Sequence, residues 1–195
     1  MKNFCSQSKK GFTLVELLIV IGILAILATV TVLVLNPAQL FAQARDSQRI
    51  ADIGTLRKAI AYYLSTASSP DLDGATIDCS TRCYVQTTGL TGNGCAGAGT
   101  ARHGTKTVTI DADRTVDVTG WIPVNLASST SGSPISVLPV DPTNNTTYFY
   151  SYACDNTNKT FESARYIQGG SDDKESTDGG NNNVMFELGT APLNL

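Results

Sequence analysis

A run of apolar, small and hydroxylated residues from Phe12 to Leu35 contains a single charged side chain, Glu16. As an α-helix, a run of about 24 residues would span about 36 Å, which is enough to cross a hydrocarbon core of about 30 Å. A helix that is apolar on every side needs an apolar environment on every side. The sequence therefore predicts a membrane-spanning helix over residues 12–35.

Positive charge lies on one side of this run. Lys2, Lys9 and Lys10 precede it, and the next cationic residue along the chain is Arg45. Because positive residues are retained on the cytoplasmic side of a membrane, we expect the N-terminus inside and the bulk of the chain outside. The whole chain has a formal net charge of −3. That balance argues against nucleic acid as the main partner, since nucleic-acid binding depends on neutralising phosphates.

Cysteine usage agrees with export. Cys5 lies before the apolar run, and the polar part of the chain holds Cys79, Cys83, Cys95 and Cys154. An even number of cysteines in an oxidising compartment predicts two disulfides. Four cysteines allow three pairings, and the sequence does not choose among them. A zinc site is the weaker alternative, because Cys-x3-Cys followed by two isolated cysteines lacks paired ligand spacing.

The N-terminus differs from a secretory signal peptide, which has an apolar stretch of about 7–15 residues followed by its cleavage site. Here the apolar run is longer, and the cleavage-like element Lys9-Lys10-Gly11 comes before it. Gly11 lets the backbone lie close against a protease, and the lysines hold that bond beside anionic lipid. The alternative is an uncleaved signal anchor, which leaves Glu16 unexplained.

The segment Lys9–Ala28, "KKGFTLVELLIVIGILAILA", resembles the N-terminus of the type IV filament superfamily, meaning type IV pilins and type II secretion pseudopilins. The resemblance implies that a prepilin peptidase cuts between Gly11 and Phe12 and methylates Phe12. Lys9, Lys10 and Gly11 would then be processing residues, and residues 1–11 a leader peptide.

Glu16 needs a partner, because a carboxylate well inside a membrane costs about 2.5–3.5 kcal/mol. Cleavage before Phe12 would create a cationic amine within about one helical turn of Glu16. We expect Glu16 of one subunit to neutralise the amine of a neighbour inside a filament, as the resemblance also implies. The alternative is a protonated or snorkelling Glu16 with no role in assembly.

A second, amphipathic helical segment follows the apolar run. Asn36-Pro37 interrupts the run, since proline removes a backbone hydrogen bond and tends to kink a helix. We predict one helix of about 55 residues from Phe12 to Ala67, with residues 36–68 as its amphipathic half. Its apolar stripe consists of Leu40, Ala44, Ile50, Ile53, Leu56, Ile60, Tyr63 and Leu64. Its polar face holds Gln43, Arg45, Asp46, Arg49, Asp52, Arg57 and Lys58.

Residues 69–195 read as a β-rich headpiece. Period-two alternation predicts five strands, over Thr105–Asp111, Thr115–Asn125, Thr147–Cys154, Thr160–Gln168 and Asn183–Gly189. An antiparallel sheet packed on the amphipathic helix would give an α+β ladle fold, with a long helical stem. Gly120–Tyr152 loosely resembles the middle of major pseudopilins, whereas the Cys- and Gly-rich segment Asp71–Gly104 departs from the compact pseudopilin pattern.

Two further features concern metals and catalysis. The resemblance implies a calcium site in a C-terminal loop, where this chain has the oxygen ligands Asp172, Asp173, Glu175 and Asp178. These lack EF-hand spacing, so a solvated acidic loop is the alternative. His103 is the single histidine and lies in the Gly-rich segment 89–104, a loop without phosphate-binding features. With no nucleophile motif nearby, we predict a solvated histidine and no enzymatic activity.

Together these features predict the structural subunit of a helical homopolymer. Its expected partners are its own copies, a prepilin peptidase, an assembly platform protein with its ATPase, and inner-membrane lipid. A surface type IV pilus is favoured by the long, Cys-bearing headpiece, and a major pseudopilin of type II secretion is the alternative. A non-polymerising, membrane-anchored extracellular binding or hydrolytic domain is the second alternative. The final location would be an extracellular or periplasmic filament.

Overall fold

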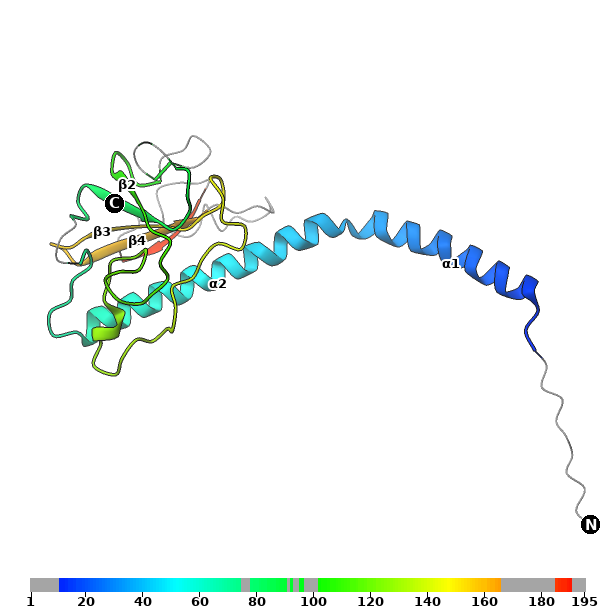
Figure 1. Cartoon of the computed structure of the whole chain (residues 1–195), viewed down its shortest axis with the longest axis horizontal. Helices are drawn as coiled ribbons and strands as arrows, with labels where there is room; N and C mark the ends of the chain where they lie inside the picture. The colour runs from blue at the N-terminus through cyan, green and yellow to red at the C-terminus, as the bar shows by residue number, and fades with distance from the viewer. Residues whose placement is uncertain are drawn as a thin grey trace, which may run out of the picture. The chain divides into compact units, whose positions relative to one another are not determined.

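The computed structural model describes residues 11–74, 78–90, 92, 95–96, 102–165 and 185–190. The chain divides into two compact units, Met1–Phe41 and Ala42–Leu195. The described elements, in chain order, are α1 (Leu14–Leu35), α2 (Pro37–Thr66), β1 (Arg82–Val85), β2 (Thr107–Ile110), the 3-10 helix η1 (Leu126–Ser128), β3 (Ser151–Asp155), β4 (Thr160–Arg165) and β5 (Phe186–Gly189) (Figure 1). The predicted α+β class is confirmed.

Helix α1 covers residues 14–35 of the predicted membrane segment 12–35. It is long and apolar enough to cross a membrane, and none of its 22 residues is buried within the chain. Two hydroxyls inside it bond to its own backbone, Thr29 to the Ile26 carbonyl at 2.8 Å and Thr31 to the Ala28 carbonyl at 2.9 Å. These polar side chains therefore need no water, which suits a helix surrounded by lipid.

The predicted continuous helix from Phe12 to Ala67 is interrupted at Asn36. Asn36 has a positive φ of 40°, in the left-handed region that asparagine tolerates better than most residues. Pro37 disfavours helical backbone at the residue before it, and its missing N–H is harmless at the first position of α2. The prediction of a single helix was wrong at this residue, and α1 begins at Leu14, after Phe12.

Helix α2 confirms most of the predicted apolar stripe. Ile53, Leu56 and Ile60 are fully inaccessible to solvent, and they pack in one core with Tyr84 and Phe161 of the sheet. The first part of the stripe behaves differently. Leu40 and Ala44 are exposed within this chain, so the core-forming part of the stripe starts later than predicted.

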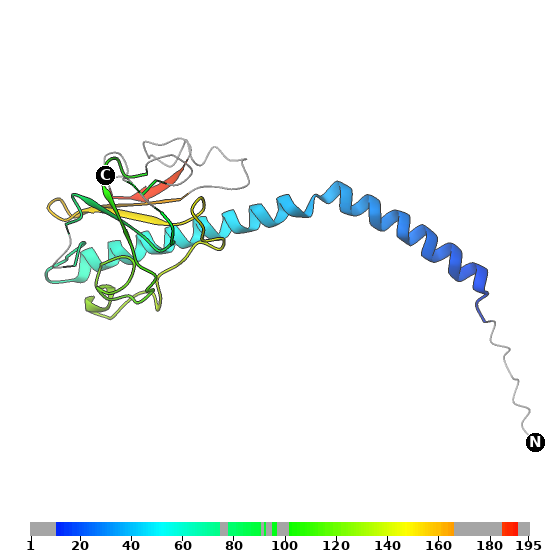
Figure 2. The same ribbon diagram turned by 45° about the horizontal axis from the view of Figure 1, so that its top comes forward.

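The sheet has five strands in the order β2-β1-β3-β4-β5. Figure 2 shows β5, in red, beside the yellow and orange strands of the sheet. Strands β1 and β2 are parallel, and every other pair is antiparallel, so the predicted antiparallel sheet is in fact mixed. A parallel pair needs a crossover, and the chain between Val85 and Thr107 supplies it. Strand β1 was not predicted; it lies within the Cys- and Gly-rich segment Asp71–Gly104, for which no strand was predicted.

The predicted strand Thr115–Asn125 was wrong. Its valines and threonines favour strands, but aspartate side chains draw the backbone into turns. Asp113 accepts from the Thr115 N–H at 2.9 Å, and Asp117 accepts from the Thr119 N–H at 2.9 Å. Gly120 then packs directly against the Thr115 carbonyl, where a side chain would clash.

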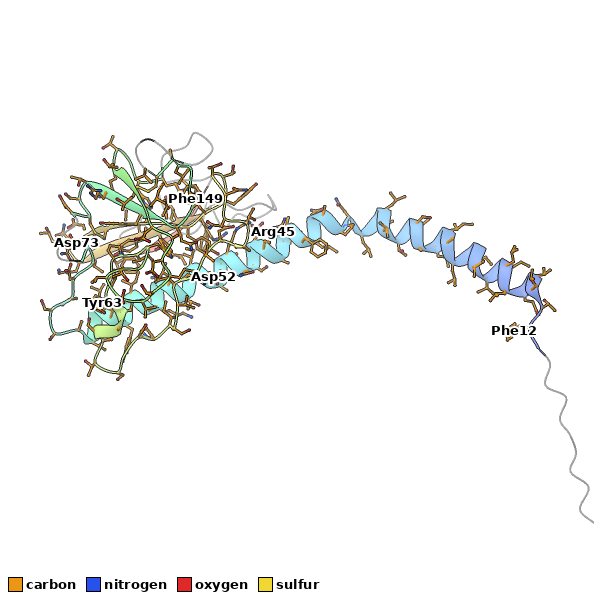
Figure 3. The ribbon with its side chains drawn as sticks, viewed as in Figure 1. Phe12, Arg45, Asp52, Tyr63, Asp73 and Phe149 are labelled. Atoms are coloured by element: carbon orange, nitrogen blue, oxygen red, sulfur yellow. A yellow bond between two sulfur atoms is a disulfide. The ribbon has the colours of Figure 1, made fainter. Side chains whose placement is uncertain are left out.

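The two faces of the sheet carry separate cores. Side chains alternate between faces along a strand, so Tyr152 of β3 faces α2 whereas Ala153 faces away. Figure 3 labels one residue from each core, Tyr63 on the α2 side and Phe149 on the other. The second core, which we call the outer core, consists of Cys83, Val85, Leu90, Cys95, Phe149 and Ala153.

Two disulfides lie in the headpiece, and their pairing was left open by the sequence. Cys79 pairs with Cys154, in the core that faces α2, and Cys83 pairs with Cys95, in the outer core. All four cysteines are fully buried. Each core is thus crosslinked once.

Arg49 of α2 is fully buried, contrary to the prediction that it lies on the polar face. Its Nε and Nη2 donate to the two carboxylate oxygens of Asp141 at 2.7 and 2.8 Å, and its Nη1 donates to Asp46 at 2.8 Å. Nη2 also donates to the Thr143 hydroxyl at 2.9 Å, and the guanidinium lies 4.9 Å from the centre of the Tyr148 ring. This bidentate geometry fastens the 141–148 loop to α2.

Replacing Arg49 should destabilise the headpiece strongly. Arg49→Met would leave the Asp141 carboxylate buried without its cation, and breaking a buried pair in this way costs about 3–5 kcal/mol. The free energy of unfolding can be measured in mild detergent by urea titration, with the fluorescence of the buried Trp121, the single tryptophan, as the signal. The control Arg57→Met removes an exposed arginine from the same helix and should change stability by less than about 0.5 kcal/mol. Equal losses would contradict the role given to Arg49.

The two disulfides should differ in their contribution to stability. They join residues 75 and 12 apart in sequence. The loop-closure relation then gives about 4–5 kcal/mol for Cys79–Cys154 and about 3 kcal/mol for Cys83–Cys95. The variants Cys79→Ala/Cys154→Ala and Cys83→Ala/Cys95→Ala, unfolded in the same assay, should rank in that order, and the reverse ranking would refute the expectation.

Candidate functional site

The first candidate site is the segment Gly11–Glu16 at the start of α1. Gly11 and Phe12 precede the helix, and the Phe12 side chain is 91% exposed (Figure 3). An added Cβ at Gly11 would meet no described atom within 4 Å. The other two predicted processing residues, Lys9 and Lys10, lie outside the described residues.

Thr13 and Glu16 form a reciprocal capping box. The Thr13 hydroxyl accepts from the Glu16 backbone N–H at 3.2 Å, while Glu16 Oε2 accepts from the Thr13 N–H at 2.8 Å and from the Thr13 hydroxyl at 2.7 Å. Backbone donors at a helix start have no partner within the helix, and this arrangement satisfies two of them. Thr-x-x-Glu is the recognised sequence signature of a capping box. The sequence therefore contained this signal, but the prediction gave Glu16 a partner in a neighbouring subunit and did not include the capping box.

The capping box gives Glu16 a local partner before any neighbouring molecule is present. The same carboxylate accepts from the Thr13 N–H, and the residue before Thr13 is Phe12, whose nitrogen is an amide in the uncut chain and would be an amine after a cut at Gly11. Carboxylates near a helix N-terminus are also stabilised by the helix dipole. The Glu16 carboxylate is exposed within the chain and could be offered to a cation near residue 12.

A second polar constellation lies on the outer face of the sheet. His103 Nε2 is 2.9 Å from the Ser151 hydroxyl of β3, and His103 Nδ1 is 3.3 Å from Glu162 Oε1 of β4. All three residues are at most 1% exposed, so the prediction of a solvated His103 was wrong. Burial, followed by the positive charges of Arg102 and Lys106, lowers the pKa of His103 to about 3.

The contacts run from the Ser151 hydroxyl to the His103 imidazole and from there to the Glu162 carboxylate, which is the arrangement of groups in hydrolytic triads. A nucleophile must nevertheless reach a substrate, and Ser151 is fully buried in this conformation. Its hydroxyl also donates to the Ala164 carbonyl at 3.3 Å. The constellation therefore connects a loop to two strands, and the geometry does not point to acyl transfer.

The predicted calcium ligands Asp172, Asp173, Glu175 and Asp178 all lie outside the described residues, and the calcium site stays a prediction. Within the described ranges, no group of three or more His, Cys, Asp or Glu residues is arranged to hold a metal ion. A pair of carboxylates does occur near the end of α2. Asn156 donates to Asp71 at 3.0 Å and to Asp73 at 2.8 Å. Burial, together with Asp71, raises the pKa of Asp73 to about 6.

Comparison with known proteins identifies the N-terminal site. A family model described as the prokaryotic N-terminal methylation motif matches residues 6–32, which include Gly11, Phe12 and the capping box. This prepilin-type motif marks the type IV pilin and pseudopilin superfamily and implies processing by a prepilin peptidase. Neither the curated proteins nor the solved structures contain a match to the chain.

Proposed function

We propose that this chain is the precursor of a structural subunit of an extracytoplasmic helical filament. The observation that carries the proposal is the methylation motif, which ends inside an apolar helix that buries none of its residues within the chain. Large exposed apolar surfaces mark interaction sites. Lipid would cover α1 in the inner membrane, and other copies of the chain would cover it in the filament.

Processing would occur between Gly11 and Phe12. Gly11 has no side chain to obstruct a peptidase, and both residues lie in the non-helical stretch before α1. Residues 1–11 would be the leader peptide, residues 12–35 the transmembrane and assembly segment, residues 36–68 the amphipathic helix and residues 69–195 the headpiece. Phe12 would become the N-methylated terminus, and Lys9 and Lys10 would position the bond at the cytoplasmic face.

Glu16 would set the register between subunits. It is the single charged residue of α1, and an unpaired charge in a low-dielectric filament core is costly. The amine of Phe12 from a neighbouring subunit would neutralise it. The Thr13–Glu16 capping box supports this role, because it stabilises the carboxylate while the subunit waits in the membrane.

A surface pilus is the form of filament that we favour, with an assembly platform protein and its ATPase as further partners. Cys83 and Cys95, joined by a disulfide, lie in the outer core, and the Cys- and Gly-rich segment Asp71–Gly104 that holds them departs from the compact pseudopilin pattern. A major pseudopilin of a type II secretion system is the second candidate. The resemblance over Gly120–Tyr152 favours it, and this stretch includes the Asp141 that binds Arg49.

Cleavage can be tested with two matched glycine substitutions in α1 and its flank. Gly11→Val should retain the leader, because a branched side chain blocks close approach of a peptidase, whereas Gly22→Val should be cut normally. Neither glycine has an atom within 4 Å of an added Cβ, so the two changes are comparable. Intact-mass spectrometry after co-expression with a prepilin peptidase should show wild-type chain starting at Phe12 with one added methyl group. An uncut wild-type chain would sink the proposal.

Assembly can be tested at Glu16. Glu16→Ala should insert into the membrane and give no filaments in sheared-cell preparations, whereas the control Thr31→Ala in the same helix should assemble. Glu16→Gln separates charge pairing from helix capping, because glutamine still forms a capping box but carries no charge. We expect Glu16→Gln to fail in assembly as well. Normal filaments from Glu16→Gln would show that capping alone matters, and normal filaments from Glu16→Ala would refute an assembly role.

A further inference from the structure

The 141–148 loop contains two overlapping Asn-x-Thr sequences, which belong to neither candidate site. They are Asn144-Asn145-Thr146 and Asn145-Thr146-Thr147. Asn-x-Ser/Thr, with any residue except proline in the middle, is the acceptor motif for N-linked glycans, and it is used in surface loops of exported proteins. Residues 142–146 are exposed, and the charge pattern around α1 predicts a headpiece outside the membrane. The loop therefore meets both conditions.

The two ends of the 141–148 loop are held by buried arginines. Near its start, Asp141 accepts two hydrogen bonds from Arg49. Near its end, Arg102 Nη2 donates to the Thr147 carbonyl at 3.1 Å. Both arginines are at most 4% exposed. The exposed part of the loop is thus presented from a fixed base, and the contacts of the two asparagines distinguish them.

Asn145 forms a closed turn with the residues that follow it. Its N–H donates to the Tyr148 carbonyl at 2.9 Å, and its Oδ1 accepts from the N–H groups of Thr147 and Tyr148 at 2.9 and 2.8 Å. A backbone N–H can only donate, so the side-chain atom that faces these two groups is the oxygen. The amide nitrogen Nδ2 of Asn145 is therefore turned away from them, and it donates to no group among the described residues.

Asn144 differs from Asn145, because its amide nitrogen has a partner. Asn144 Nδ2 donates to Gln86 Oε1, just after β1, at 3.2 Å. A glycan on Asn144 would displace this contact. A glycan on Asn145 would leave the turn intact, because the turn uses Oδ1 and the backbone and leaves Nδ2 free. One hydrogen bond of this kind corresponds to about a threefold to tenfold preference for Asn145.

We propose that Asn145 is the acceptor of an N-linked glycan, transferred from an oligosaccharide on a polyprenyl diphosphate. Asn145 Nδ2 forms a bond to the anomeric carbon of the first sugar, while the bond between that carbon and the diphosphate oxygen breaks. The polyprenyl diphosphate leaves as an anion, and a base of the transferase takes the proton that Nδ2 loses. The step needs the headpiece outside the membrane, but it needs neither cleavage at Gly11 nor filament formation.

The glycan can be sought by peptide mass mapping of the full chain, purified from the membranes of the cells that produce it. The peptide that contains the 141–148 loop should be heavier by whole sugar residues, and its fragment ions should place the added mass on Asn145. An unmodified peptide would overturn the proposal, and so would a glycan on Asn144 alone. Membranes hold uncut and cut chains alike, so the result is scored separately from processing at Gly11.

Two matched threonine variants test which motif is read. Thr147→Val removes the third residue of the Asn145 motif and should abolish the modification in the same cells. Thr146→Val removes the third residue of the Asn144 motif and should leave the modification in place. Valine has nearly the shape of threonine, and neither hydroxyl has a partner among the described residues, so both variants should keep the loop. Loss of the glycan in both variants, or in neither, would contradict the assignment to Asn145.

The contribution of the fold can be measured with an oligosaccharyltransferase that requires Asn-x-Thr alone, supplied with an oligosaccharide on polyprenyl diphosphate. The acceptors are the full chain folded in detergent micelles and the same chain after reduction and unfolding. Folding should raise the ratio of Asn145 to Asn144 modification by about threefold to tenfold. Gln86→Ala frees Asn144 Nδ2 and should remove most of this gain, because Asn144 then lacks its partner. A ratio that does not change on unfolding would refute selection by the loop.

Discussion

The buried ion pair between Arg49 and Asp141 connects helix α2 to the 141–148 loop of the headpiece. From Asp111 to Tyr150 the described chain has no strand, so no backbone ladder secures this long stretch to the rest of the fold. Side-chain contacts replace the ladder, and among them Arg49 donates four hydrogen bonds to oxygen atoms and lies against the ring of Tyr148. A lone charge at this depth would be costly, and the bidentate geometry makes it tolerable. The packing of α2 on the sheet depends on that balance, because the 141–148 loop bridges α2 and β3.

The N-terminal unit differs from the headpiece, because its described side chains are not buried within the chain. Helix α1 buries nothing within the chain, whereas α2 buries residues from Asp46 to Tyr63 in the headpiece. The hydrophobic effect gains nothing from α1 until lipid or another copy covers it. The headpiece buries its own core, whereas α1 leaves its apolar side chains uncovered within the chain, which is compatible with the proposed role as a filament subunit. The capping box extends this reasoning to the charge, since Thr13 satisfies the Glu16 carboxylate within the chain, before the proposed pairing with a neighbouring subunit.

Local signals explain which features could be predicted from the sequence. The apolar run, the helical stripe ending at Tyr63 and the alternation in β4 are each complete within a short window, so periodicity alone identifies them. The burial of Arg49 and of His103 was predicted wrongly, because no local signal indicates it. Each looks like a surface residue in its own window, and its partner lies far along the chain, 92 residues away for Arg49 and 48 for His103. The Thr-x-x-Glu signature was a local signal that could have been used, because a capping box is defined within four residues.

Polar contacts secure both faces of the sheet, and each of them joins residues that are far apart in sequence. On the face toward α2, Arg49 and Asp141 form a buried, bidentate ion pair. On the outer face, His103 lies 2.9 Å from the Ser151 hydroxyl and 3.3 Å from the Glu162 carboxylate. In both places a buried polar side chain fastens a described loop to a helix or a strand where no backbone ladder does so, and a buried polar group of this kind is tolerated because it has partners.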